Sequence, residues 1–191
     1  MIRLKMPSPP IEALGRHIQL LSLNARDFLA ACKRESFQGS GPGGQKRNRV
    51  YSGVRLTLDD LFVTAAEHRE SERNKKAAVH RLRVKIALRA DSFCMPEELS
   101  LGELEAARSL PLETQSFQPA FRVKINPAHF DFPRCVFTAC VLLRAGRADV
   151  RGAAGTLGVT NSALIKFLKL DKSVFSHANH LRALYDRHPL R

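Results

Sequence analysis

GSGPGGQKRNRVYSGVRL, residues 39–56, is the stretch that decides the fold. Its first six residues contain four glycines and one proline, so the backbone there is open to torsions that other residues avoid. The neutral Gln45 follows, and three bases lie within the next four residues. From Gly53 onward apolar and polar side chains alternate, which predicts a strand with one buried face. We therefore expect a glycine-rich loop that leads directly into a strand.

The segments on either side of this stretch predict a small sheet, which we expect to be short and mixed. Asp59 and Asp60 make a two-residue turn, and residues 61–66 return as the partner strand. Residues 36–38 begin another short strand, after a helix over residues 25–35 that Asn24 caps.

Residues 71–88 predict a long basic helix with Ser71 as its cap. Three apolar side chains recur at helical spacing: Val79, Leu82 and Ile86. The opposite face carries bases, among them Arg73, Lys76 and Arg83. Such a face is either an ordinary solvated surface or a surface for nucleic acid.

The overall charge favours a polyanionic partner. Lys and Arg number 31 against 18 Asp and Glu, a net charge of +13, while 44% apolar residues suffice for a packed core. Residues 33–90 carry a net charge of +8 and residues 144–191 one of +6, whereas residues 91–143 carry −3. This distribution predicts two nucleic-acid contact regions, with an anionic membrane surface as the competing interpretation.

Apolar runs and cysteines indicate a cytoplasmic protein. The longest strongly apolar run, residues 135–143, is too short to span a bilayer, and the first ten residues lack the apolar segment of a secretion signal. The four cysteines fit free thiols in a reducing compartment. A zinc site from Cys135, Cys140 and His129 matches no common spacing, so we expect buried cysteines, no metal and no cofactor.

The C-terminal region predicts a series of short capped helices. A helix starts near Pro133 and ends before Gly146, and later helices follow caps at Asp149, Thr160 and Asp171. Residues 150–168 are similar to a helix-turn-helix, with Ala154, Gly158 and Leu164 as its small residue, turn glycine and buried aliphatic. Its outward face would present four polar side chains: Asn161, Ser162, Lys166 and Lys169. The alternative is a plain helical corner with a solvated face.

Residues 25–90 resemble the catalytic domain of class I peptide-chain release factors, and more closely the short ribosome-rescue peptidyl-tRNA hydrolases. The motifs that carry the resemblance are SGPGGQ (residues 40–45), Asn48, VRL (residues 54–56) and the basic helix that opens with Arg73-Asn74-Lys75. GGQ alone is a weak signal, but in this spacing it is specific.

The resemblance implies hydrolysis of the ester between a nascent peptide and transfer RNA, in the peptidyl-transferase centre of a stalled ribosome. The catalytic residues would be Gly43, Gly44 and Gln45, with the Gln45 N–H stabilising developing charge and its side chain positioning water. The candidate RNA contacts are Lys46, Arg47, Asn48, Arg49, Arg55, Arg69, Arg73, Lys75, Lys76, Lys166 and Lys169. Many relatives have His at the position of Lys46, and often Gln at that of Glu72. These differences bear on the fine positioning of the catalytic residues and not on the class of protein.

We expect an α+β catalytic domain over residues 25–92 and an all-α domain over residues 127–191, with a lead-in over residues 1–24 and a connecting segment over residues 93–126. The expected partners are ribosomal RNA and peptidyl-tRNA, and a glutamine methyltransferase acting on Gln45 is a further candidate. We expect a monomer that does not read stop codons, because too few residues precede Gln45 for that domain. The alternatives are a DNA-binding regulator or a ribosome-binding factor with an inert loop, and a glycine-rich loop that only binds phosphate.

Overall fold

The computed structural model describes residues 10–38, 51–91 and 121–191. The chain divides into two compact units, one of Leu23–Ile86 and one of Met1–Ser22 with Ala87–Arg191. The first contains a three-stranded sheet and most of a long helix, and the second contains a group of helices. The predicted α+β class is therefore confirmed.

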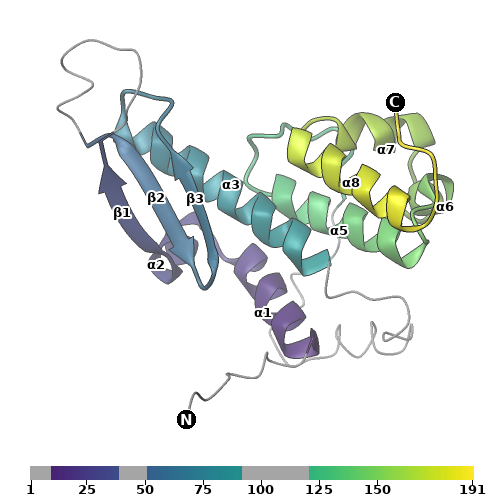
Figure 1. Ribbon diagram of the computed structural model, residues 1–191, viewed down its shortest axis with the longest axis horizontal. Helices are drawn as coiled ribbons and strands as arrows, with labels where there is room; N and C mark the ends of the chain where they lie inside the picture. The colour runs from purple at the N-terminus through teal and green to yellow at the C-terminus, as the bar shows by residue number, and fades with distance from the viewer. Residues whose placement is uncertain (1–9, 39–50, 92–120) are drawn as a thin grey trace. The chain divides into compact units, whose positions relative to one another are not determined.

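The sheet unit contains α2 (Ala25–Ala31), β1 (Lys33–Phe37), β2 (Gly53–Leu58), β3 (Leu61–Ala65) and most of α3 (Ser71–Asp91). The strand order is β1-β2-β3, and α3 lies along one face of the sheet (Figure 1). Both strand pairs are antiparallel, so the expectation of a mixed sheet was wrong. The reason is that each connection joins the near ends of neighbouring strands, which forces the chain to reverse.

The core of this unit lies between β2 and α3, as the alternation predicts. Val54, Leu56 and Leu58 are buried while Arg55 is exposed. The α3 side chains in this core are Ala78, Leu82 and Ile86, all with no exposed surface. The turn between β2 and β3 is the predicted one, with Asp59 in the left-handed region at φ 54°.

The boundaries of α2 and α3 differ from the predictions. Asn24 caps α2 as expected, accepting from the N–H groups of Arg26 and Asp27 at 3.0 Å each. The helix nevertheless ends at Ala31, because residues 33–37 pair with β2 and the sheet overrides their helix propensity. Ser71 is the first residue of α3 rather than its cap, since the Glu70 carbonyl already accepts from the Asn74 N–H.

Arg83 was predicted on the exposed basic face of α3 but is 1% exposed. Its guanidinium lies 5.3 Å from the centre of the Phe28 ring, and Nη1 donates to the Leu23 carbonyl at 3.0 Å. This base therefore joins α3 to α2 instead of facing a partner.

The helical unit contains α1 (Pro10–Ser22), α5 (Phe132–Ala145), α6 (Val150–Thr156), α7 (Asn161–Leu168) and α8 (Lys172–Leu184). The predicted caps are confirmed: Asp149 accepts from two α6 N–H groups, Thr160 from one in α7 and Asp171 from two in α8. Pro133 lies in the first turn of α5, and Gly146 ends that helix. The core side chains of α5, α7 and α8 include Phe132, Val136, Leu143, Leu164, Phe167 and Leu181.

The helix α1 was not predicted, because the prolines before it suggested a loose lead-in. Leu20 and Leu21 are buried, and α1 contacts α5 within the same unit. Among the described ranges, no helix combines the length and apolar character needed to cross a bilayer.

Candidate functional site

The glycine-rich segment connects the ends of two neighbouring strands. Phe37, the last residue of β1, is opposite Gly53, the first residue of β2. The predicted catalytic residues Gly43, Gly44 and Gln45 lie between these two points, outside the described residues, as do the predicted RNA contacts Lys46, Arg47, Asn48 and Arg49. The structure thus shows how the segment is attached to the sheet at both ends.

The backbone of Gly53, at the start of β2, lies so close to Phe37 that no side chain fits there. A Cβ atom on this residue would lie 2.8 Å from the Phe37 ring and 2.9 Å from the Phe37 carbonyl oxygen. The ring could rotate away, but the carbonyl belongs to the paired strand and cannot. Only glycine therefore fits at this base of the segment.

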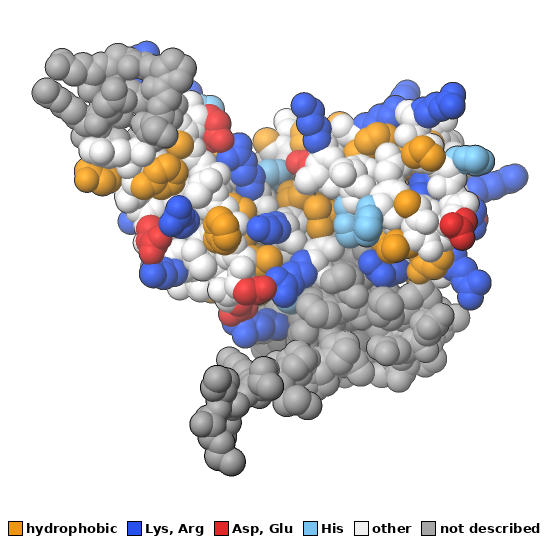
Figure 2. All heavy atoms as spheres, viewed as in Figure 1, with side chains coloured by type: hydrophobic (Ala, Val, Ile, Leu, Met, Phe, Trp, Pro, Cys, Tyr) orange, Lys and Arg blue, Asp and Glu red, His pale blue; other side chains and the backbone are white. Residues whose placement is uncertain are grey.

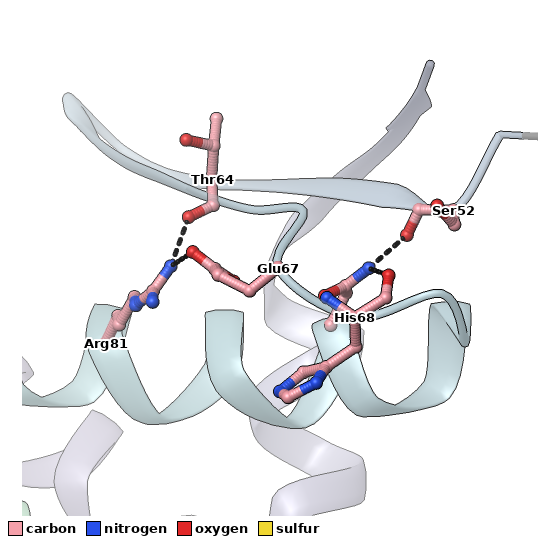
Figure 3. A network of polar contacts seen from close by, with 6 residues as sticks. Ser52, Thr64, Glu67, His68 and Arg81 are labelled. Carbon is pink, nitrogen blue, oxygen red and sulfur yellow. Dashed lines mark hydrogen bonds and ion pairs between the residues drawn. The ribbon is translucent and has the colours of Figure 1, made fainter. Parts of the chain in front are cut away.

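Asn74 holds the residue that follows the segment. Its side chain is fully buried, and Nδ2 donates to the Ser52 carbonyl and to the His68 carbonyl, each at 2.8 Å. Oδ1 accepts from the His68 N–H at 2.9 Å. Figure 3 shows how Ser52 and His68 come together at this point. Both amide hydrogens and the oxygen are used, so one side chain joins the exit of the segment to the first turn of α3.

Sequence reasoning used Asn74 only as part of a motif and did not assign it this role. The available signal was its position at i, i+4 and i+8 with Ala78 and Leu82, which places a polar amide on the buried stripe of α3. A buried amide needs partners, and backbone carbonyls in the adjoining loops are the usual ones.

Two other α3 bases cover the edge of the sheet. Arg81 Nη1 donates to the Thr64 carbonyl at 2.9 Å and to Glu67 Oε1 at 2.7 Å (Figure 3). Lys85 Nζ donates to the Phe62 carbonyl at 3.2 Å. Arg81 and Lys85 are four residues apart on α3, which is about one helical turn. Their acceptors Thr64 and Phe62 are two residues apart on β3, so both side chains reach the same edge of this strand. These bases close an edge that would otherwise offer acceptors to another chain.

The predicted RNA contacts in this unit fall into two groups. Arg55 lies 3.8 Å from Glu35, Arg73 lies 2.9 Å from Glu70 and Lys75 lies 2.6 Å from Glu72. The hydrogen bond from Lys75 lowers the pKa of Glu72, so this carboxylate stays charged. Arg69 and Lys76 are exposed and form no ion pair within the described part of the chain.

The structure brings most of these bases to one place. Arg73, Lys75 and Lys76 share the first turns of α3 with Asn74, and Arg69 lies two residues before that helix begins. Since Asn74 holds Ser52, the exit of the glycine-rich segment lies at this basic end of α3. Arg55 is on β2, and Lys166 and Lys169 are exposed in the helical unit.

The cysteines and histidines of the described ranges include no group of three potential ligands that could hold a metal ion. Cys135 and Cys140 are buried, as expected, and Cys32 is half-buried. Burial raises the pKa of the Cys32 thiol to about 11, which keeps it protonated at neutral pH.

Residues 29–109 match the family model of the RF-1 domain, the catalytic domain of the class I release factors. The match begins within α2 and includes the three strands, α3 and the glycine-rich segment. The chain is therefore similar to the RF-1 domain over these residues, and the resemblance seen in the sequence is confirmed. No curated protein and no solved structure matches the chain.

Proposed function

We propose that this chain, through its RF-1 domain, hydrolyses the ester of peptidyl-tRNA on stalled ribosomes without reading a codon. The RF-1 domain itself gives the chain a release-factor-like role in translation termination or rescue. The observation that carries the proposal is the family match over residues 29–109, which includes the GGQ sequence at residues 43–45.

In the proposed mechanism, the ribosome supplies the reaction site and this chain supplies Gly43, Gly44 and Gln45. The two glycines let the backbone approach the RNA closely, and the Gln45 N–H donates to the oxyanion that forms as water attacks the ester. The Gln45 side-chain amide is neutral, so it can orient water without competing as a nucleophile. The contacts of Gly53 and Ser52 support this role, because they fix the position where the segment rejoins the sheet.

The bases at the start of α3 would hold the domain against ribosomal RNA. Arg69 and Lys76 are exposed and form no close ion pair with a described carboxylate. Arg55, Arg73 and Lys75 are paired, but exposed ion pairs contribute only about 0–1 kcal/mol, so exchanging a carboxylate for a phosphate costs little. Lys46, Arg47, Asn48 and Arg49 are proposed to contact RNA beside the catalytic residues.

The test is peptide release from ribosomes that carry labelled peptidyl-tRNA and no stop codon. We expect the full chain to release peptide. The Gly43→Ala/Gly44→Ala variant should be slower by about 100-fold or more, because the alanines block the torsions that place the Gln45 N–H and the loss of one oxyanion donor lowers the rate by about that factor. Gly155→Ala is the matched control, since its Cβ would meet nothing within 4 Å. Release by the double variant at the wild-type rate would contradict the proposed mechanism.

A second candidate function, a DNA-binding regulator, is favoured by the geometry of α6 and α7. A short turn joins these helices, and Gly158 within it has φ 66°, which glycine adopts readily. Co-sedimentation with ribosomes, compared with binding to random duplex DNA, separates this candidate from the first. Tight, sequence-selective DNA binding without ribosome binding would favour the regulator.

A further inference from the structure

We infer that α7 and the start of α8 form a second RNA-binding surface, outside the RF-1 domain. The surface is built around Lys166, Lys169 and Lys172, and we name it the three-lysine surface. This goes beyond the proposed hydrolysis, because it assigns binding to a part of the chain that does not carry the catalytic residues. Only the identity of the RNA as ribosomal rests on the proposed function.

The packing of α7 determines which side chains face solvent. Leu164, Phe167 and Leu168 have no exposed surface, and the Phe167 ring lies 4.9 Å from that of Phe121 and 5.5 Å from that of Phe132, centre to centre. The other side of the helix is exposed at Asn161, Ser162, Lys166 and Lys169. The rotation of α7 about its axis is thus fixed by its core, and its polar face is held outward.

Within the residues that the structure describes, no carboxylate pairs with the lysines of this surface. The three lysines recur at intervals of three residues. Asp171 is the one acidic residue between positions 150 and 185. Its carboxylate accepts from the N–H groups of Ser173 at 2.8 Å and Val174 at 3.2 Å, and from the Ser173 hydroxyl. This carboxylate therefore caps the N-terminus of α8.

Stability does not explain the position of Lys172, whereas Lys166 in the last turn of α7 and Lys169 at its C-cap lie where the helix dipole favours a cation. Lys172 is the first residue of α8, where the helix dipole disfavours a cation by about 0.3–1 kcal/mol. Lys169 Nζ lies 5.6 Å from the centre of the Phe175 ring, and this contact holds the amine at the corner between the helices. By contrast, Arg55, Arg73 and Lys75 in the sheet unit each have a carboxylate partner. An external polyanion would supply the negative charge that no described carboxylate provides to the three-lysine surface.

The surrounding side chains favour RNA as that polyanion. Asn161 and Ser162 offer donors and acceptors for phosphate oxygens and the 2′-hydroxyl group. A membrane-binding helix would present a continuous apolar face. From α7 to the end of α8 the large exposed apolar residues are Leu170, 41% exposed, between the two helices and Leu184, 56% exposed, at the end of α8, and these two do not form such a face. In Figure 2, Lys and Arg side chains project from the surface where Figure 1 labels α6, α7 and α8.

The experiment measures binding of the full chain to a fluorescein-labelled RNA duplex of about 20 base pairs at several salt concentrations. We compare the wild type with Lys166→Gln/Lys169→Gln/Lys172→Gln and with a control of equal charge, Arg26→Gln/Lys124→Gln/Arg191→Gln, at three exposed positions elsewhere. We expect the slope of log affinity against log salt to fall in magnitude by about 2–3 for the first variant, and by less than about 1 for the control. Melting curves confirm that both variants fold.

Each outcome bears on the inference independently of hydrolysis. If the three-lysine variant keeps the wild-type slope and affinity, or if the control loses as much, the inference is wrong even when peptide release succeeds. If the chain never releases peptide but the slope falls as expected, the proposed function fails and the RNA surface stands. Tighter binding to a DNA duplex of equal length, lost in the same variant, would overturn the assignment to RNA.

Discussion

Asn74 links stability and function at the level of a single residue. Its amide satisfies the Ser52 carbonyl in a buried position and both backbone groups of His68 in a half-buried one. An alanine there would leave these groups without their partner, and a buried unsatisfied group costs about 1–3 kcal/mol. We expect Asn74→Ala to lower the free energy of unfolding by at least that amount, measured by urea denaturation.

The same substitution should slow release at saturating concentrations of the chain, because Ser52 holds the exit of the glycine-rich segment. Lys76→Ala, two residues away on the exposed side of α3, is the stability control and should change the free energy of unfolding by less than about 0.5 kcal/mol. An Asn74→Ala chain as stable as the wild type would show that the contacts with Ser52 and His68, on one side of the view in Figure 3, contribute nothing to the fold.

At the level of elements, two glycines three residues apart should respond to alanine in opposite ways. Gly155 lies within α6 with open space around it, so Gly155→Ala should stabilise the chain by up to about 1 kcal/mol through helix propensity. Gly158 also has open space but has φ 66°, where a side chain is strained, so Gly158→Ala should destabilise by about 1 kcal/mol. Thermal melts of both variants check the pair. Equal shifts of the same sign would mean that backbone conformation does not govern this turn.

The elements that sequence reasoning predicted well are those with a local cause. The caps at Asn24, Asp149, Thr160 and Asp171 and the turn at Gly158 depend on residues a few positions apart, and all are found. The β2–β3 hairpin was predictable for the same reason, since two residues connect strands of clear alternation.

The errors arise where a distant partner decides. Residues 33–35 would continue α2 by propensity, but they pair with β2 some twenty residues later. Arg83 has the spacing of an exposed base, yet it is buried because its guanidinium packs on the Phe28 ring and donates to the Leu23 carbonyl. The role of Asn74 depends on its contact with Ser52, which lies 22 residues before it in the sequence. No pattern within a short window contains these contacts.

Across the whole molecule, basic charge is placed in both compact units but is used differently. In the sheet unit, several bases are tied to carboxylates or to the edge carbonyls of β3. In the helical unit, the three-lysine surface has no such partner among the described residues. We therefore propose that the sheet unit positions the proposed catalytic segment, while the helical unit contributes affinity for RNA.

The division of labour proposed here also predicts what the chain does alone. Gln45 carries a neutral amide, which neither removes a proton from water nor attacks a carbonyl, so the ribosome must supply the rest of the reaction site. We expect purified peptidyl-tRNA in solution to be hydrolysed no faster with the full chain than without it, as measured by release of labelled peptide. His68 is the imidazole whose backbone is tied through Asn74 to Ser52, so it is the residue to exclude as a hidden base. His68→Gln should keep wild-type release on ribosomes, because its backbone bonds do not depend on the side chain. Rapid turnover in solution, abolished by His68→Gln, would show that the chain contains its own active site and would contradict a borrowed one.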